Sequence, residues 1–188
     1  MAHAIKHYVY IVALVIASAL LLTPALYADW NFKQIIPRTE QIYGPASADA
    51  LQRILNWQRL IESEKKDDEK DQLKRVNQFF NDNVRFLSDQ IVWHQEDYWA
   101  TPIEALRKGA GDCEDYAIAK YMTLRQLGVP SEKLRITYVK AIRLNQAHMV
   151  VTYYTDPSAV PLVLDNLTGN IELASQRTDL IPVYAFNG

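Results

Sequence analysis

The fold of this chain is decided by one stretch of sequence, Gly111-Asp112-Cys113-Glu114-Asp115-Tyr116-Ala117-Ile118-Ala119-Lys120-Tyr121. Its opening residues predict that a helix begins at Cys113 and continues beyond Tyr121. The helix is expected to end at Gly128, because glycine is favoured just after a helix, and Pro130 follows it. A cysteine is therefore predicted at a helix N-terminus.

A shorter helix is predicted immediately before this stretch. Thr101 as N-cap, Pro102 in the first helical position and Glu104 in the third match a capping box, and Gly109 ends the helix. Two amphipathic helices are predicted further upstream, the first with Ser47 as its N-cap. The charged residues 64–70 are expected to form a solvated helix end or turn between them.

The apolar pattern changes to a period of two in the second half of the chain. This alternation predicts strands over residues 134–139, 148–154 and 160–165, and a fourth over residues 181–186. Helices that precede a group of strands favour an α+β domain over a doubly wound α/β domain.

The N-terminus has the pattern of a secretory signal. Lys6 and His7 precede the apolar residues 9–22, and Ala28 provides a small residue at the predicted cleavage site. We expect a signal peptide over residues 1–28, a single domain over residues 29–188, and export to the periplasm. The alternative is that the segment remains as an uncleaved anchor, although its apolar run is short for a membrane span of about 20 residues.

The net charge and the cysteine content exclude some classes of function. The formal net charge is −2, with no strongly basic block, so nucleic-acid binding has no electrostatic support. Cys113 is the only cysteine, so it cannot form an internal disulfide. A free thiol in an exported protein is a liability unless it is buried or used.

Cys113 is a candidate nucleophile because a helix N-terminus stabilises the thiolate, which is the reactive form. The alternative is a small buried hydrophobic residue, a common role for a lone cysteine. Only His94 and His148 lie within residues 29–188. His148 begins a predicted strand and is the candidate base, although a polar residue at a strand edge would look the same.

Asp165 is the candidate third member of a Cys-His-Asp triad. If the chain reverses between Asp156 and Pro157, His148 lies directly opposite Asp165 on neighbouring strands, with Cβ atoms about 5 Å apart. A carboxylate there would hold the correct imidazole tautomer. A slip of one residue would turn Asp165 to the other face of the sheet. The alternative is that Asp165 simply begins a turn after the strand.

The acids Asp112, Glu114 and Asp115 surround the candidate nucleophile. Unscreened carboxylates would raise the thiol pKa and oppose its activation. Clustered carboxylates suit Ca²⁺, and a bound cation would reverse this effect. The alternative is that acids in a first helical turn only complement the helix dipole.

Four segments resemble the bacterial transglutaminase-like cysteine proteinases, and more narrowly their periplasmic LapG-type members. They are Tyr98-Trp99-Ala100-Thr101-Pro102, the stretch from Gly111 to Tyr121, Ala147-His148-Met149-Val150 and Leu164-Asp165-Asn166. The resemblance implies a papain-like, transglutaminase-like core in which the nucleophile helix packs on an antiparallel sheet. It also implies that Cys113, His148 and Asp165 are catalytic.

The resemblance further implies a substrate, a cofactor and a partner. Members of the family cleave the N-terminal region of large biofilm adhesins and depend on calcium bound beside the nucleophile, where Asp112 and Glu114 match. They are inhibited by the periplasmic domain of an inner-membrane receptor for cyclic di-GMP. The expected activity is therefore calcium-dependent peptide hydrolysis. Transglutamination by the same triad and a non-catalytic calcium-dependent binding module are the alternatives.

Overall fold

The computed structural model describes residues 30–187, so the signal segment predicted over residues 1–28 lies outside the described residues. Within residues 30–187, no helix has both the length and the apolar character that crossing a membrane requires.

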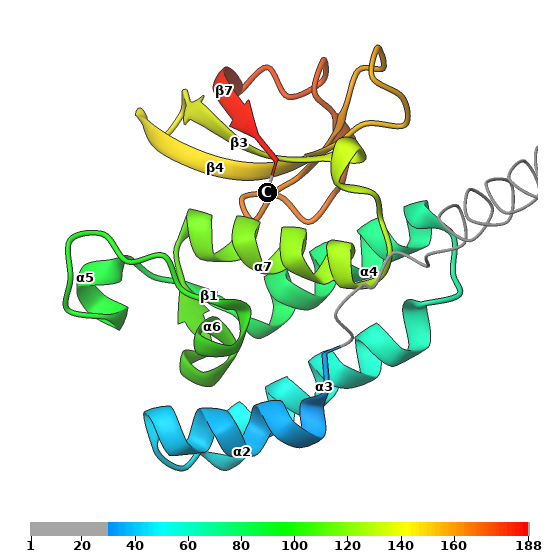
Figure 1. Cartoon of the computed structure of the whole chain (residues 1–188). Helices are drawn as coiled ribbons and strands as arrows, with labels where there is room; N and C mark the ends of the chain where they lie inside the picture. The colour runs from blue at the N-terminus through cyan, green and yellow to red at the C-terminus, as the bar shows by residue number, and fades with distance from the viewer. Residues whose placement is uncertain (1–29, 188) are drawn as a thin grey trace, which may run out of the picture.

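Helices form most of the first two thirds of the described chain (Figure 1). They are α2 (Phe32–Tyr43), α3 (Ala48–Glu64), α4 (Glu69–Asn83), α5 (Asp89–Val92), α6 (Pro102–Lys108) and α7 (Cys113–Gln126), with a 3-10 turn, η1 (Ser131–Lys133), after them. The charged residues predicted to separate two helices lie at the end of α3, in the turn and at the start of α4.

A five-stranded antiparallel sheet follows in the order β6-β5-β4-β3-β7. Its strands are β3 (Leu134–Ala141), β4 (Gln146–Tyr153), β5 (Leu162–Leu164), β6 (Glu172–Leu173) and β7 (Leu180–Phe186). Figure 1 shows this sheet on one side of α7, with α3 and α2 on the other. The predicted α+β class is confirmed, as is the packing of the cysteine-bearing helix against an antiparallel sheet.

The helix ends follow from local sequence. Ser47 accepts a hydrogen bond from the Ala50 N–H at the start of α3. Thr101 and Glu104 form the predicted capping box at the start of α6. Gly109 ends α6 in the left-handed conformation, with φ of 63°, which is favourable mainly for glycine. These caps set where α6 stops and therefore where α7 begins.

A buried apolar core joins α7 to both of its neighbours. Leu124 of α7 and Val151 of β4 belong to the same cluster as Phe80 of α4, and all three are fully buried. Trp57 of α3 packs there too, and its indole N–H donates to Thr123 Oγ1 of α7 at 2.9 Å. Helix α7 is therefore held in place by packing on both of its sides.

The predicted hairpin register was wrong by two residues. In the structure Val151 pairs with Leu164, so Asp165 falls opposite Val150 rather than His148. The hairpin loop is longer than the tight reversal assumed, because β5 begins only at Leu162. Since side chains alternate with a period of two, a shift of two residues leaves Asp165 on the face predicted for it.

The sequence did not predict several short elements that frame the site. The strands β1 (Arg85–Phe86) and β2 (Ala110–Gly111) form a parallel pair, which brings the segment after α4 beside the residues that lead into α7. Helix α5 follows β1 directly, so the chain that carries Asp89 returns to the N-terminal end of α7.

Candidate active site

Cys113 is the first residue of α7, with Asp112 as the N-cap. Its side chain is partly exposed in a cavity of about 470 Å³. Aromatic residues from four parts of the chain line this cavity together with His148: they are Phe86, Trp99, Tyr138 and Tyr184. A cleft with a thiol, an imidazole and apolar walls can accommodate an extended peptide.

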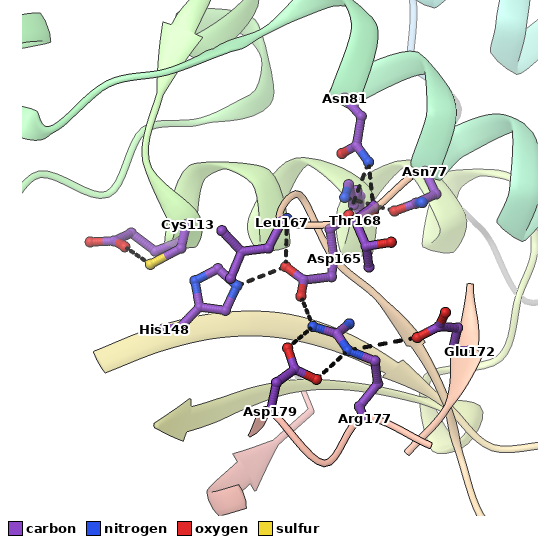
Figure 2. Close-up of polar contacts among 12 residues, drawn as sticks. Asn77, Asn81, Cys113, His148, Asp165, Leu167, Thr168, Glu172, Arg177 and Asp179 are labelled. Carbon is purple, nitrogen blue, oxygen red and sulfur yellow. Dashed lines mark hydrogen bonds and ion pairs between the residues drawn. The ribbon is translucent and has the colours of Figure 1, made fainter. Parts of the chain in front are cut away.

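His148 and Asp165 are in direct contact, as predicted. His148 Nε2 lies 2.7 Å from Asp165 Oδ1, and both side chains are almost completely buried. Figure 2 shows the Cys113 sulfur on the other side of the imidazole, facing the ring nitrogen that Asp165 leaves free. The three side chains therefore lie in the order thiol, imidazole and carboxylate, an order that nucleophilic catalysis by cysteine requires.

Asp165 is ionised in spite of its burial. Burial by itself would raise the pKa of Asp165, but the hydrogen bond from His148, the backbone N–H of Leu167 and the guanidinium of Arg177 lower it to about 2. An ionised carboxylate accepts a hydrogen bond from the imidazole and stabilises its protonated form.

The thiol of Cys113 is in an unfavourable environment for ionisation. It donates a hydrogen bond to Glu114 Oε2 at 3.0 Å. Burial raises the pKa of Cys113 well above its usual value, and the Glu114 and Asp112 carboxylates raise it further, while the backbone of Met149 acts in the opposite direction. This environment therefore favours the protonated thiol over the thiolate.

Five carboxylates gather beside the thiol. Ligand atoms of Asp89, Asp112 and Asp115 lie within 4.8 Å of one another, as do those of Asp89, Asp97 and Glu114. Asp89 Oδ1 and Asp112 Oδ1 are buried and have no hydrogen-bond partner within the described chain. Burial, followed by the neighbouring carboxylate of Glu114, raises the pKa of Asp112 to about 9. A cluster of carboxylates that includes two buried, unpartnered oxygens fits a hard cation that takes oxygen ligands.

Asp115 differs from the other acids because backbone groups already engage both of its oxygens. Oδ1 accepts from the Ala100 N–H at 2.7 Å, and Oδ2 accepts from the Asp112 N–H at 3.3 Å. A Cβ on Gly111 would lie 2.5 Å from Asp115 Oδ2, so glycine is required there for Asp115 to approach. The Asp115 carboxylate therefore links, by hydrogen bonds, the segment that leads into α6 to the segment that leads into α7.

We expect Asp115→Ala to lower the melting temperature of the domain in saturating calcium. It leaves two N–H groups without an acceptor, and each unsatisfied buried group costs about 1–3 kcal/mol. Asp115→Asn, which keeps one acceptor, should lose less. Thermal denaturation checks this result. If Asp115→Ala melted like the wild type but lost calcium binding, Asp115 would be a metal ligand instead.

The sequence did not predict three functional candidates. Asp89 and Asp97 lie in the segment between β1 and α6, well before the acidic trio, and only folding brings them to it. Arg177 follows β6, and its guanidinium contacts Asp165. A buried arginine has no local sequence signal, because its partner is determined by the tertiary fold.

The chain is similar to solved structures of one bacterial protein. A comparison with curated protein sequences finds no match. Among solved structures, calcium-bound LapG from Legionella pneumophila is 47% identical with a TM-score of 0.71, covering 81% of this chain and 82% of that one. EGTA-treated LapG from the same organism is 46% identical with a TM-score of 0.73, covering 85% and 84% of the two chains.

The family comparison gives the same assignment. The model of the bacterial transglutaminase-like cysteine proteinases matches residues 55–180, which run from α3 to the start of β7 and include Cys113, His148 and Asp165. The match covers more than half of the chain and agrees with the LapG structures in fold. This chain belongs to the bacterial transglutaminase-like cysteine proteinase family.

Proposed function

We propose that this protein is a calcium-dependent cysteine endopeptidase that uses Cys113, His148 and Asp165 as its catalytic triad. The observation that carries the proposal is the order of these side chains: the thiol faces an imidazole whose Nε2 is held at 2.7 Å by an ionised carboxylate. Nucleophilic catalysis by cysteine requires a base and a group that orients the base.

The mechanism begins with transfer of the Cys113 proton to His148. The thiolate attacks the peptide carbonyl carbon, and the backbone N–H groups at the start of α7 are placed to stabilise the oxyanion. His148 then protonates the leaving amine, so that a thioester to Cys113 remains. Water, deprotonated by His148, hydrolyses the thioester and regenerates the thiol.

Calcium fits the carboxylate cluster, and it is the ion in one of the related LapG structures. We propose that Asp89, Asp97, Asp112 and Glu114 hold it. Bound calcium would supply positive charge beside the thiol and offset the negative field that opposes thiolate formation. The Glu114 carboxylate, which accepts a hydrogen bond from the Cys113 thiol in this structure, would then face the ion instead.

The substrate and the cellular setting are part of the same proposal. We propose that the domain acts in the periplasm on the N-terminal region of a large surface adhesin. We also propose that the periplasmic domain of an inner-membrane cyclic di-GMP receptor restrains it. The family membership and the resemblance to LapG support this assignment.

The experiment is to incubate purified residues 29–188 with the N-terminal region of an adhesin from the same genome, with and without calcium. We expect calcium-dependent cleavage and, by mass spectrometry, two fragments with free new termini. Cross-linked glutamine side chains without backbone cleavage would instead identify a transglutaminase. Calcium-dependent binding without any covalent change would identify a binding module.

A further inference from the structure

The Asp165 carboxylate has a second charged partner besides His148 (Figure 2). Oδ1 accepts from His148 Nε2 at 2.7 Å and from the Leu167 N–H at 3.1 Å. Oδ2 accepts from Arg177 Nη2 at 2.7 Å. The two oxygens therefore face different partners, and rotation of the carboxylate would break both sets of contacts.

We propose that Arg177 is a positioning residue for catalysis. Its guanidinium fixes Oδ2 of Asp165 so that Oδ1 remains directed at His148, and its charge keeps the buried carboxylate ionised. Arg177 acts through Asp165 and does not touch the thiol. This inference rests on the proposed role of Asp165 in the triad.

The guanidinium of Arg177 is itself held rigidly. Nε and Nη2 donate to the two carboxylate oxygens of Asp179, both at 2.9 Å, and Glu172 Oε2 lies 3.8 Å from Nε. The Arg177 side chain is only 5% exposed. Asp179 and then Asp165 raise the pKa of Arg177 above its usual value in spite of burial. The fork shape of arginine allows one side chain to bind both acids.

Within residues 30–187, Lys120 also interacts electrostatically with Asp165, but it is less suited to this task. Lys120 of α7 is 1% exposed, and burial lowers its pKa to about 7, although Asp165 partly opposes this. Its Nζ donates to Asn77 Oδ1 at 2.7 Å. A lysine with that pKa loses charge near neutral pH, whereas an arginine does not. Arg177 is therefore the permanent counter-charge.

The loop that follows Asp165 is anchored independently of Arg177. Asn81 of α4 donates to the Asp165 carbonyl at 2.9 Å, and Asn77 donates to the Gly169 carbonyl at 3.3 Å. These bonds hold the backbone, while Arg177 is bonded to the carboxylate. Loss of Arg177 should therefore disturb the orientation of the carboxylate more than the position of the loop.

The test is a double-mutant cycle on peptide cleavage with Arg177→Met, Asp165→Asn and the double variant. Arg177→Met should lower kcat by about 10- to 100-fold with KM nearly unchanged, a size typical of losing a group that orients a catalytic residue. In the Asp165→Asn background the same change should have almost no further effect. Arg177→Lys should recover part of kcat.

Arg53→Met is the matched control. Arg53 donates to the carbonyls of Leu106 and Arg107 at the end of α6, so its loss should affect stability without changing kcat below the melting temperature. If Arg177→Met does not fold, Arg177→Lys is tested in its place. We expect Arg177→Lys to have a lower kcat than the wild type, with KM unchanged. The melting temperature of each variant is measured alongside.

A spectroscopic readout separates positioning from a purely structural role. Residues 29–188 contain only His94 and His148, so ¹⁵N-histidine labelling gives two imidazoles. The His148 Nε2–H signal should shift in Arg177→Met and remain unchanged in Arg53→Met. Wild-type kcat in a folded Arg177→Met variant, or equal losses in both backgrounds of the cycle, would overturn the inference. Full activity in Asp165→Asn would instead refute the proposed triad.

Discussion

Cys113→Ala is expected to reduce cleavage of the adhesin fragment to background while the domain remains folded. Without the thiol no thioester forms, and loss of a nucleophile lowers kcat by about 10⁶-fold in a comparable hydrolase. The Cys113 side chain lies at the edge of the core, in the cavity, so its truncation leaves the packing of α7 on the sheet largely intact. Cleavage is followed by gel and mass spectrometry, and folding by circular dichroism.

A substitution of His148 tests the same mechanism independently. His148→Gln keeps an N–H donor for Asp165 but cannot take up the thiol proton, so activity should fall as severely as in Cys113→Ala. His94→Ala is the control, because His94 is exposed and lies outside the cavity lining. Proteolysis at the wild-type rate by a folded Cys113→Ala protein would contradict the proposed mechanism.

Removal of calcium should produce a loss of similar size. In a chelator the thiol shares its environment with carboxylates that raise the pKa of Cys113, so thiolate formation and cleavage should cease. Added calcium should restore activity. Magnesium should restore little, because it requires a tight octahedral shell and loses water reluctantly. Isothermal titration and activity of the metal-stripped domain provide the measurement.

Single substitutions identify the ligands. Asp89→Asn, Asp112→Asn and Glu114→Gln should each weaken calcium binding and reproduce the chelated state with Cys113 intact. Glu62→Gln is the control, because it removes an exposed carboxylate from α3. Undiminished cleavage in chelator, with no calcium bound at about millimolar concentration, the weak end of protein calcium sites, would refute the calcium proposal.

The stabilisation by calcium should also depend on pH. The folded state raises the pKa of Asp112 to about 9, so it favours the protonated carboxyl. In chelator, stability is therefore lost as pH rises through the interval between the unfolded pKa and the folded value. Calcium removes this penalty by binding the ionised form. The difference in melting temperature between the two conditions should widen from about pH 5 to about pH 8.

The sequence was sufficient for elements whose determinants are local. The Thr101–Glu104 capping box and the left-handed Gly109 mark the limits of α6 through contacts within a few residues of each end. The same holds for Cys113 at the start of α7. Periodicity identified the longer strands, but it placed the hairpin register two residues away from the observed one, because loop length is not encoded in the alternation.

In the candidate site, too, some residues could be predicted from local sequence and others could not. The sequence pointed to Cys113, His148 and Asp165 as candidates for the triad, and to Asp112 and Glu114, which flank the thiol, as candidate metal ligands. Asp115 was grouped with them, although its oxygens hold backbone N–H groups. Periodicity and composition cannot distinguish a carboxylate that caps a helix from one that faces a cavity when the two residues are neighbours in the chain.

Local sequence by itself determined where α7 begins, that His148 and Asp165 are the candidates for the base and the orienting acid, and that acids flank the Cys113 thiol. Only the tertiary structure decided that Asp89 and Asp97 join those acids, and that Arg177 binds the far oxygen of Asp165. The physical reason is the distance along the chain between the residues that interact. A cap depends on hydrogen bonds within one helical turn, whereas the partners of a buried charge are determined by how α5, α7 and the sheet pack together.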